Sequence, residues 1–265
     1  MKEEAMSAFS LDGKVVILTG GAGFLGQKYA DALCSSGAKV YTWDKNISTG
    51  PVRDSIFEEV LDITNESRVQ LAVKRIVESN SKIDILINNA AMNPAVGGGD
   101  ASKKQFVPIE DYPVDLWRQE LDVNLTGMFI CTKAVVPIMK KQVKGVIVNV
   151  ASEVSNIAHD HRVYGEVGKY KSPGYVTSKT GVVGLTRACA AQLGQFGIRV
   201  NAFSPGGVGN DKMPADFVRR FGDSNMLGRM ATSDEYCATM IYLCSDASSF
   251  MTGHNMTVDA GKCSW

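Results

Sequence analysis

The sequence predicts an α/β fold: a single domain over residues 1–265, with a doubly wound parallel sheet flanked by helices on both faces. Apolar runs of strand length alternate with longer segments of helical period along the chain. The strand-like runs are nearly continuous in Val, Ile and Leu, which is typical of strands buried on both faces of a parallel sheet. No linker, repeat or low-complexity tract divides the 265 residues.

Each expected element follows from its own pattern. Short β-branched and aromatic runs predict strands at Val15–Thr19, Lys39–Trp43, Ile83–Asn88, Gly145–Ala151, Arg199–Phe203 and Asn255–Val258. Apolar residues at helical spacing predict helices at Phe24–Ser36, Glu66–Ser79, near Leu116–Lys140, at Gly174–Gln195 and near Ser233–Leu243. Two polar stretches, at about 93–113 and 156–173, follow strand ends, where open α/β sheets bind ligands. We expect both to be substrate-side loops.

Charge and cysteine usage narrow the class of partner. Lys plus Arg (28) equals Asp plus Glu (28), so no net charge draws the protein to nucleic acid or to an anionic membrane. No apolar stretch reaches the ~20 residues that cross a bilayer, and MKEEAMSAFS lacks a signal-peptide core. The six cysteines form no CxxC pair, and a zinc site from His159 and His161 lacks a third ligand. We therefore expect a cytoplasmic protein with reduced thiols, no metal and a small-molecule partner.

A glycine-rich loop follows the first expected strand. Gly20, Gly23 and Gly26 lie where backbone N–H groups can approach a pyrophosphate, although an ordinary strand-to-helix turn is the alternative. Asp44 ends the second strand 44 − 20 = 24 positions later, close to the ~20 at which a carboxylate accepts hydrogen bonds from a ribose. That carboxylate would repel a 2′-phosphate, so NAD is the expected cofactor. NADP stays possible because Lys45 follows at once.

Tyr175 and Lys179 stand four residues apart at the start of an expected helix, so their side chains share a face. A phenol has a pKa of about 10, and a neighbouring ammonium lowers it toward the range of a working acid or base. Such a pair alone is common on helix surfaces. Other motifs decide its meaning.

The ordered motifs resemble those of the short-chain dehydrogenase/reductase family, whose members have a Rossmann fold. The resemblance runs from Gly13-Lys14-Val15 to Val258-Asp259-Ala260-Gly261. In order, the motifs are the glycine loop, Asp62, Asn88-Asn89-Ala90, Asn124, Ser152, Tyr175-x-x-x-Lys179, Arg199-Val200-Asn201 and Ser204-Pro205-Gly206.

The resemblance implies a role for each site residue. Tyr175 would donate or accept the substrate proton, and Ser152 would hydrogen-bond the substrate oxygen, where hydride transfer builds negative charge. Lys179 would bind the nicotinamide ribose and lower the tyrosine pKa, and Asn124 would hold a water that relays protons. The implied cofactor-binding set is Gly20, Gly23, Phe24, Leu25, Gly26, Asp44, Asp62, Ile63, Asn89, Ala90, Ala91, Tyr175, Lys179, Pro205, Gly206 and Val208.

The chain departs from the family pattern in its glycines. Phe24 stands where most classical members have glycine, and the spacing Gly20-x-x-Gly23-x-x-Gly26 is that of the extended subfamily, which includes sugar-nucleotide epimerases. Ala91 also replaces a usual glycine. The C-terminal half is classical, so we expect a classical-type core with an extended-type glycine motif.

The spacing of the catalytic groups also differs. Tyr175 follows Ser152 by 175 − 152 = 23 positions, where classical members have about thirteen, so some ten residues are inserted on the substrate side. Because the insertion is polar, we expect it to contact the substrate through His161 or Arg162. A surface flap or a subunit contact is the alternative.

These observations lead to one main hypothesis and two competing ones. The main hypothesis is an NAD(H)-dependent oxidoreductase acting on a carbonyl or alcohol carbon of a small polar substrate, such as a sugar or sugar-derived acid. The others are a nucleotide-sugar epimerase or dehydratase with bound NAD, and a non-catalytic dinucleotide sensor. By resemblance we also expect a homo-oligomer, either a tetramer or a dimer, that pairs through the long helices Leu116–Lys140 and Gly174–Gln195. Small residues in the second of these helices would permit close approach: Gly181, Gly184, Ala188 and Ala191.

Overall fold

The computed structural model describes residues 6–48, 54–93, 105–165 and 169–265. Its described residues form a seven-stranded sheet in the order β3-β2-β1-β4-β5-β6-β7, with every pairing parallel. The strands are β1 (Val15–Thr19), β2 (Lys39–Asp44), β3 (Ile56–Val60), β4 (Ile85–Asn88), β5 (Gly145–Val150), β6 (Ile198–Pro205) and β7 (Asn255–Val258).

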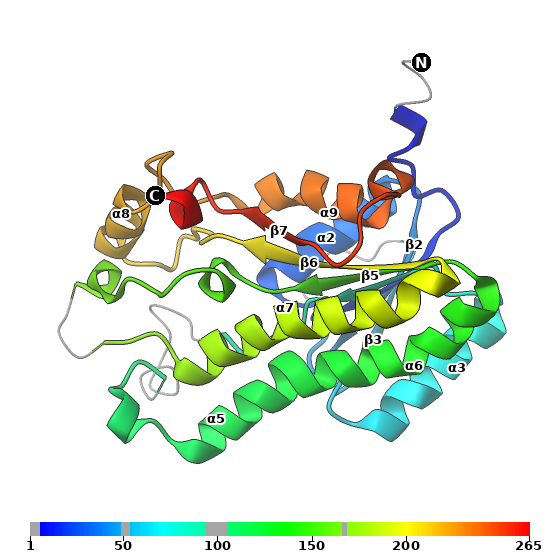
Figure 1. The fold of residues 1–265 in the computed structure, drawn as a ribbon, viewed down its shortest axis with the longest axis horizontal. Coiled ribbons are helices and arrows are strands. Elements are labelled where there is room, and N and C mark those ends of the chain that lie inside the picture. The colour runs from blue at the N-terminus through cyan, green and yellow to red at the C-terminus, as the bar shows by residue number, and fades with distance from the viewer. Residues whose placement is uncertain (1–5, 49–53, 94–104, 166–168) are drawn as a thin grey trace.

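Helices cover both faces of this sheet (Figure 1). The first face carries α3 (Glu66–Asn80), α5 (Val114–Leu121), α6 (Gly127–Gln142) and α7 (Pro173–Leu193), and the second carries α2 (Phe24–Ser35) and α9 (Cys237–Cys244). Each face has its own apolar core, one around Ile17 and Ile147 and the other around Leu18 and Val148. Consecutive residues of a strand point to opposite faces, so these continuous apolar runs supply both cores. The predicted doubly wound α/β fold is confirmed.

Two elements have no counterpart in the sequence-based prediction. The edge strand β3 reads Ile-Phe-Glu-Glu-Val and is largely exposed, so it lacks the apolar run that marks the buried strands. Helix α8 (Ala215–Asp223) is short, and only Phe217, Phe221 and Gly222 in it are buried. It lies at the end of the sheet near the C-terminus (Figure 1), where it faces the insertion.

The expected helix near Leu116–Lys140 extends further than its apolar pattern indicated. It runs without a break from α5 through a π-helical turn, Asp122–Thr126, into α6. This 29-residue span, Val114–Gln142, is long and apolar enough to cross a membrane by length and composition alone. One side of it packs on α3 and α7, so in this fold it is a layer of the α/β domain.

Candidate active site

A cavity of about 640 Å³ opens at the carboxyl ends of the central strands. Its nucleotide side is lined by the glycine loop and by the ends of β2 and β4. Its substrate side is lined by residues that follow β5, by the insertion and by α8. Every predicted cofactor residue lines this cavity except Lys179. An open α/β sheet is expected to bind its ligand at this edge.

The glycine loop is shaped for a phosphate group. Gly20 has a φ of +70°, and a Cβ there would lie 2.7 Å from the Ala90 Cα; a Cβ on Gly26 would collide with the Gly20 carbonyl oxygen. Helix α2 begins after Gly23 with no side-chain cap and no acidic residue in its first turn. Its first N–H groups are therefore left for an anion, which fits a dinucleotide pyrophosphate. Phe24, the first residue of α2, lines the cavity and is 53% exposed.

The carboxylate of Asp44 is held in place by the main chain. Its oxygens accept hydrogen bonds from the N–H groups of Ala22 at 3.1 Å and Asn46 at 3.0 Å. Lys45 forms an ion pair with Asp62 at 2.9 Å. Burial raises the pKa of Asp62, but hydrogen bonds from Lys45 and Thr64 outweigh it and hold that pKa below its usual value. Lys45 is thus already paired, and the Asp44 carboxylate fits the free diol of a ribose.

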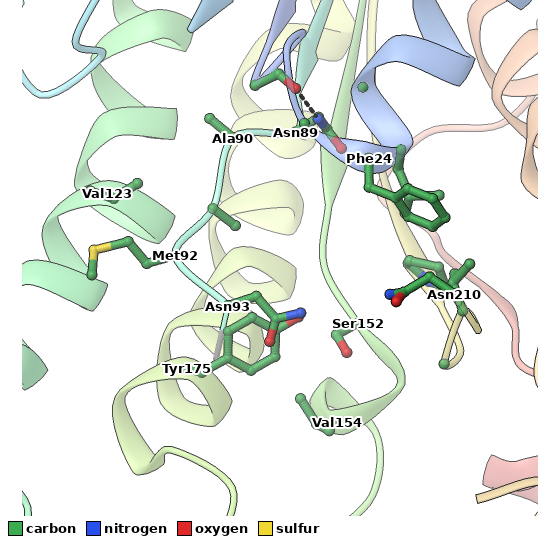
Figure 2. A pocket seen from close by; sticks show the side chains of 18 of the residues that line it. Phe24, Asn89, Ala90, Met92, Asn93, Val123, Ser152, Val154, Tyr175 and Asn210 are labelled. Carbon is green, nitrogen blue, oxygen red and sulfur yellow. Dashed lines mark hydrogen bonds between the residues drawn. The ribbon is translucent and has the colours of Figure 1, made fainter. Parts of the chain in front are cut away.

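Asn89 joins the ends of two central strands. Its Nδ2 donates to the carbonyl oxygens of Thr19 at 3.1 Å and Gly20 at 3.2 Å. The Thr19 hydroxyl in turn accepts from the N–H groups of Asn89 and Ala90, each at 3.0 Å. Figure 2 shows Asn89 and Ala90 next to each other at the cavity. These hydrogen bonds hold the segment after β4 against the end of β1 and so shape the nucleotide side of the cavity.

Ser152 and Tyr175 reach the same part of the cavity from β5 and α7 (Figure 2). The hydroxyl of Ser172 accepts a hydrogen bond from the Tyr175 N–H at 3.1 Å, and Pro173 begins the helix, so Tyr175 stands in the first turn. Burial raises the pKa of Tyr175 to about 12, although hydrogen bonding with Ser152 lowers it. The phenol is therefore protonated near neutral pH, as a proton donor requires.

Lys179 lies behind the tyrosine and is fully buried. Its ammonium donates to the Val150 carbonyl at 2.6 Å and is 5.9 Å from the Tyr175 ring centroid. Burial, and then the charge of Lys171, lower the pKa of Lys179 to about 7. The raised pKa of Tyr175 and the lowered pKa of Lys179 have the same main cause, since both groups are buried. The lowering of the tyrosine pKa by this ammonium remains a prediction.

Asn124 occupies the π-helical turn between α5 and α6. Its Oδ1 accepts from the Met92 N–H at 2.7 Å, and its Nδ2 donates to the Met92 carbonyl at 3.1 Å and the Ser178 hydroxyl at 3.0 Å. Both amide donors are used, so the side chain ties the segment after β4 to α7. Its role in holding a relay water remains a prediction. Since π-turns often mark functional sites, this position stays relevant to the cavity.

The two residues that the sequence suggested for substrate contact do not line the cavity. The side chain of Arg162 is 91% exposed and pairs with Asp160 at 2.9 Å. His161 accepts a hydrogen bond from the Lys171 N–H at 3.3 Å and packs on Tyr170. A 3₁₀ turn at His161–Tyr164 explains the difference, because its start is exposed while Val163 and Tyr164 are buried.

Other residues of the insertion do line the cavity: His159, Tyr164 and Lys171. Tyr164 stacks on Phe217 of α8, with ring centroids 5.8 Å apart. Arg220 of α8 donates to the Val163 carbonyl at 3.0 Å, which fastens the insertion to this helix. These contacts are difficult to predict from the sequence, because the partners are about fifty residues apart. The one sequence pattern that could have indicated α8 and its contact with the insertion is the pair of buried phenylalanines four positions apart in this helix.

A buried ion pair closes the floor of the substrate side. Glu153, which follows Ser152, lies 3.2 Å from Lys262 near the C-terminus, and both side chains are almost fully buried. Burial raises the pKa of Glu153, and this effect exceeds the lowering of the pKa by the positive charge of Lys262. The Lys262 ammonium also lies 3.6 Å from the Phe221 ring centroid. Sequence reasoning missed this pair because 262 − 153 = 109 positions separate its members.

Comparison with known proteins agrees with the geometry. A family model described as enoyl-(acyl carrier protein) reductase matches residues 21–262. A trans-4-hydroxycyclohexanecarboxylate dehydrogenase from Sinomonas cyclohexanicum is 34% identical over 263 residues, which cover 94% of this chain and 92% of the relative. This chain belongs to the short-chain dehydrogenase/reductase family. The curated relative acts as a dehydrogenase, in keeping with an oxidoreductase of CH–OH groups.

Solved structures of the family have the same fold. A short-chain dehydrogenase from Leptospira borgpetersenii with bound NAD⁺ matches with a TM-score of 0.86 and 27% identity, covering 97% of this chain and 95% of that one. A gluconate 5-dehydrogenase from Burkholderia cenocepacia, in complex with NADP and tartrate, matches with a TM-score of 0.84 and 25% identity, covering 98% and 99%. Both nicotinamide dinucleotides thus occur among the structural neighbours of this chain.

Proposed function

We propose that this protein is an NAD(H)-dependent dehydrogenase that moves a hydride between nicotinamide and the alcohol or carbonyl carbon of a small polar substrate, with a hydroxy acid as the favoured class. One observation carries the proposal. Ser152 and Tyr175 reach a cavity that continues directly into the glycine loop and Asp44. A single domain over residues 1–265 would contain the whole site.

The proton chemistry falls to residues of this chain. When bound, NAD⁺ supplies the hydride acceptor and a positively charged ring. Tyr175 donates the proton in reduction and accepts it in oxidation, while Ser152 hydrogen-bonds the substrate oxygen as charge develops there. Lys179, whose ammonium donates to the Val150 carbonyl, would hold the ribose hydroxyls near the phenol when the cofactor is bound. Asn124 accepts a hydrogen bond from the Met92 N–H and so holds the segment after β4 next to these residues.

The choice of NAD over NADP rests on charge at the end of β2. Asp44 lines the cavity, and its orientation is fixed by two main-chain N–H groups. Lys45, the cation that could favour a 2′-phosphate, is occupied by Asp62. A like charge at this position disfavours the phosphate.

The substrate class is suggested by the relatives and by the lining. Trans-4-hydroxycyclohexanecarboxylate and gluconate, named in two of the similar proteins, both carry a carboxylate. The sugar-derived acid expected from the sequence belongs to the same group. The epimerase and sensor alternatives are not favoured, because the relatives are named dehydrogenases.

We further propose a cytoplasmic homo-oligomer, a tetramer or dimer, built through the outer faces of the long helices. Phe129 on α6 is half exposed, and Gly184, Ala188 and Ala191 on α7 are exposed. Apart from the main chain of α7 itself, no atom of the described residues lies within 4 Å of where a Gly184 Cβ would be, which leaves room for another helix. Sedimentation at micromolar concentration tests this, and a monomer alone would contradict it.

A substrate panel tests the function. Hydroxy acids, sugars, sugar acids and polyols are incubated with NAD⁺ or NADP⁺, and the absorbance of reduced nicotinamide is followed. We expect turnover of at least one hydroxy acid with a preference for NAD⁺. Tightly held NAD that is never released would instead favour the epimerase, and absence of dinucleotide binding would reject both.

A further inference from the structure

One cation of the insertion lies inside the cavity. Lys171 stands two residues before α7, and its ammonium is 4.2 Å from the ring centroid of Tyr175. It donates a hydrogen bond to the Asn93 Oδ1 at 2.7 Å, and both residues line the cavity. An ammonium has three N–H donors. A charged donor group with capacity to spare therefore lies beside the catalytic phenol.

The neighbouring carboxylates are bound to other groups. Within the described ranges, no acidic side chain forms an ion pair with Lys171. Glu153 pairs with Lys262 at 3.2 Å, and Glu120 accepts hydrogen bonds from Tyr112 and Ser172. Burial lowers the pKa of Lys171 to about 8, while these two carboxylates oppose the shift from a distance. An ammonium in this state is short of a direct counter-charge, which an anionic ligand would supply.

His159 provides a second, independent observation. Both of its ring nitrogens are buried and have no hydrogen-bond partner, and the residue lines the same cavity. Its ring packs on Tyr164, with centroids 5.4 Å apart. Burial lowers the pKa of His159 to about 3, so the ring is neutral and carries one N–H donor. Both nitrogens thus lack a protein partner, and a polar ligand group that reaches the ring from the cavity would supply one.

We propose that Lys171 and His159 form a subsite for a carboxylate of the substrate, in which the lysine supplies the charge and the histidine a second hydrogen bond. The proposal rests on the proposed function in one respect: the alcohol or carbonyl carbon of the same molecule reacts at Tyr175. Because Lys171 lies against the Tyr175 ring, the carboxylate is placed close to the reacting carbon.

An apolar part of the lining lies beyond this subsite. Met213, Phe217, Phe221 and Met230 face the cavity from α8 and its flanking segments. These methionine and phenylalanine side chains have no N–H or O–H group that could hydrogen-bond a substrate hydroxyl. This part of the cavity therefore fits the carbon skeleton of a small carboxylic acid.

A pair of fluorinated probes tests the subsite by binding alone. 4-Fluorobenzoate and its uncharged amide, 4-fluorobenzamide, have nearly the same shape, and their binding to the full chain is followed by the fluorine NMR line width. Charged hydrogen bonds of this kind change affinity by about ten- to a hundredfold. We expect the benzoate to bind at least about tenfold more tightly than the amide. In Lys171→Met the benzoate should lose that advantage.

Two variants serve as controls. Arg162→Met removes another cation of the insertion, which is exposed and paired with Asp160, and should leave both probes unchanged. His159→Phe keeps the ring contact with Tyr164 and should weaken the benzoate less than Lys171→Met does. Equal affinities for the two probes, or benzoate binding unaffected by Lys171→Met, would overturn the subsite. The latter result would assign Lys171 to the tuning of Tyr175.

The probes contain no alcohol or ketone, so the binding result does not depend on turnover. If the benzoate binds through Lys171 but no hydroxy acid is oxidised in the panel, the subsite stands and the dehydrogenase proposal fails. If oxidation is found without discrimination between the probes, the proposed function stands and the subsite is wrong.

Discussion

The nucleotide side and the substrate side of the cavity are built in different ways. On the nucleotide side, a short loop follows β1, a carboxylate ends β2 and an asparagine follows β4, and main-chain hydrogen bonds hold each in place. On the substrate side, the insertion, α8 and the C-terminal Lys262 meet through side chains far apart in the sequence. Strand geometry therefore sets the first side, and long-range packing sets the second.

The largest expected effect comes from the residue where the two sides meet. Tyr175→Phe removes the phenolic proton and keeps the ring that Lys171 contacts. We expect kcat to fall by roughly 10²- to 10⁴-fold, the usual contribution of general acid–base catalysis, with little change in NADH affinity. Steady-state kinetics and fluorescence titration measure the two. Near-normal kcat would remove Tyr175 from the chemistry.

A glycine substitution tests whether the main chain alone builds the nucleotide side. A Cβ on Gly26 would collide with the Gly20 carbonyl, and overpacking of this kind costs about 1–3 kcal/mol. Gly26→Ala should therefore weaken NADH binding by about tenfold or more. Gly194→Ala is the matched control, since no atom lies within 4 Å of its Cβ position. Unchanged binding in Gly26→Ala would mean that the loop adapts.

The cofactor preference tests the charge on the same side. Asp44→Ala removes the carboxylate that is expected to repel a 2′-phosphate, so the affinities for NADH and NADPH should converge. We expect the wild type to favour NADH by about tenfold or more, equivalent to ~1.4 kcal/mol. Fluorescence titration of both reduced cofactors decides it. Equal affinities in the wild type would contradict the role given to Asp44.

The smallest effect probes the substrate side through stability. The pKa of Lys171 is about 8 in the folded protein and 10.5 in its ordinary state, so between these values the unfolded chain holds the proton that the folded chain has lost. Stability contributed by this group is therefore present above pH 10.5 and lost as the pH falls through 8. Lys171→Met should flatten this pH dependence by at most about 1.8 kcal/mol, and by less where solvent screens the charge, as measured by urea unfolding at pH 7.5 and 9.5. An identical pH dependence in both proteins would show that the ammonium is well solvated.

Much of the fold and of the nucleotide side could be predicted from the sequence. The strand Val15–Thr19 was predicted with its observed bounds, because its continuous apolar run satisfies both cores. The edge strand β3 was missed because its glutamates face solvent and leave no such run. For the site, the glycine loop, Asp44 and Asn89 follow strand ends, and parallel strands bring those ends to one edge of the sheet.

By itself, the sequence determined the main helices and strands, with β3 and α8 as exceptions, and it indicated the candidate catalytic side chains. The tertiary structure decided how the insertion is turned. A 3₁₀ turn capped by Asp160 exposes His161 and Arg162, whereas the contact of Tyr164 with α8 brings His159 and Lys171 to the cavity. Periodicity records which residues of a regular element are buried. An irregular loop has no period, so the direction of each of its side chains depends on the distant surfaces against which it packs.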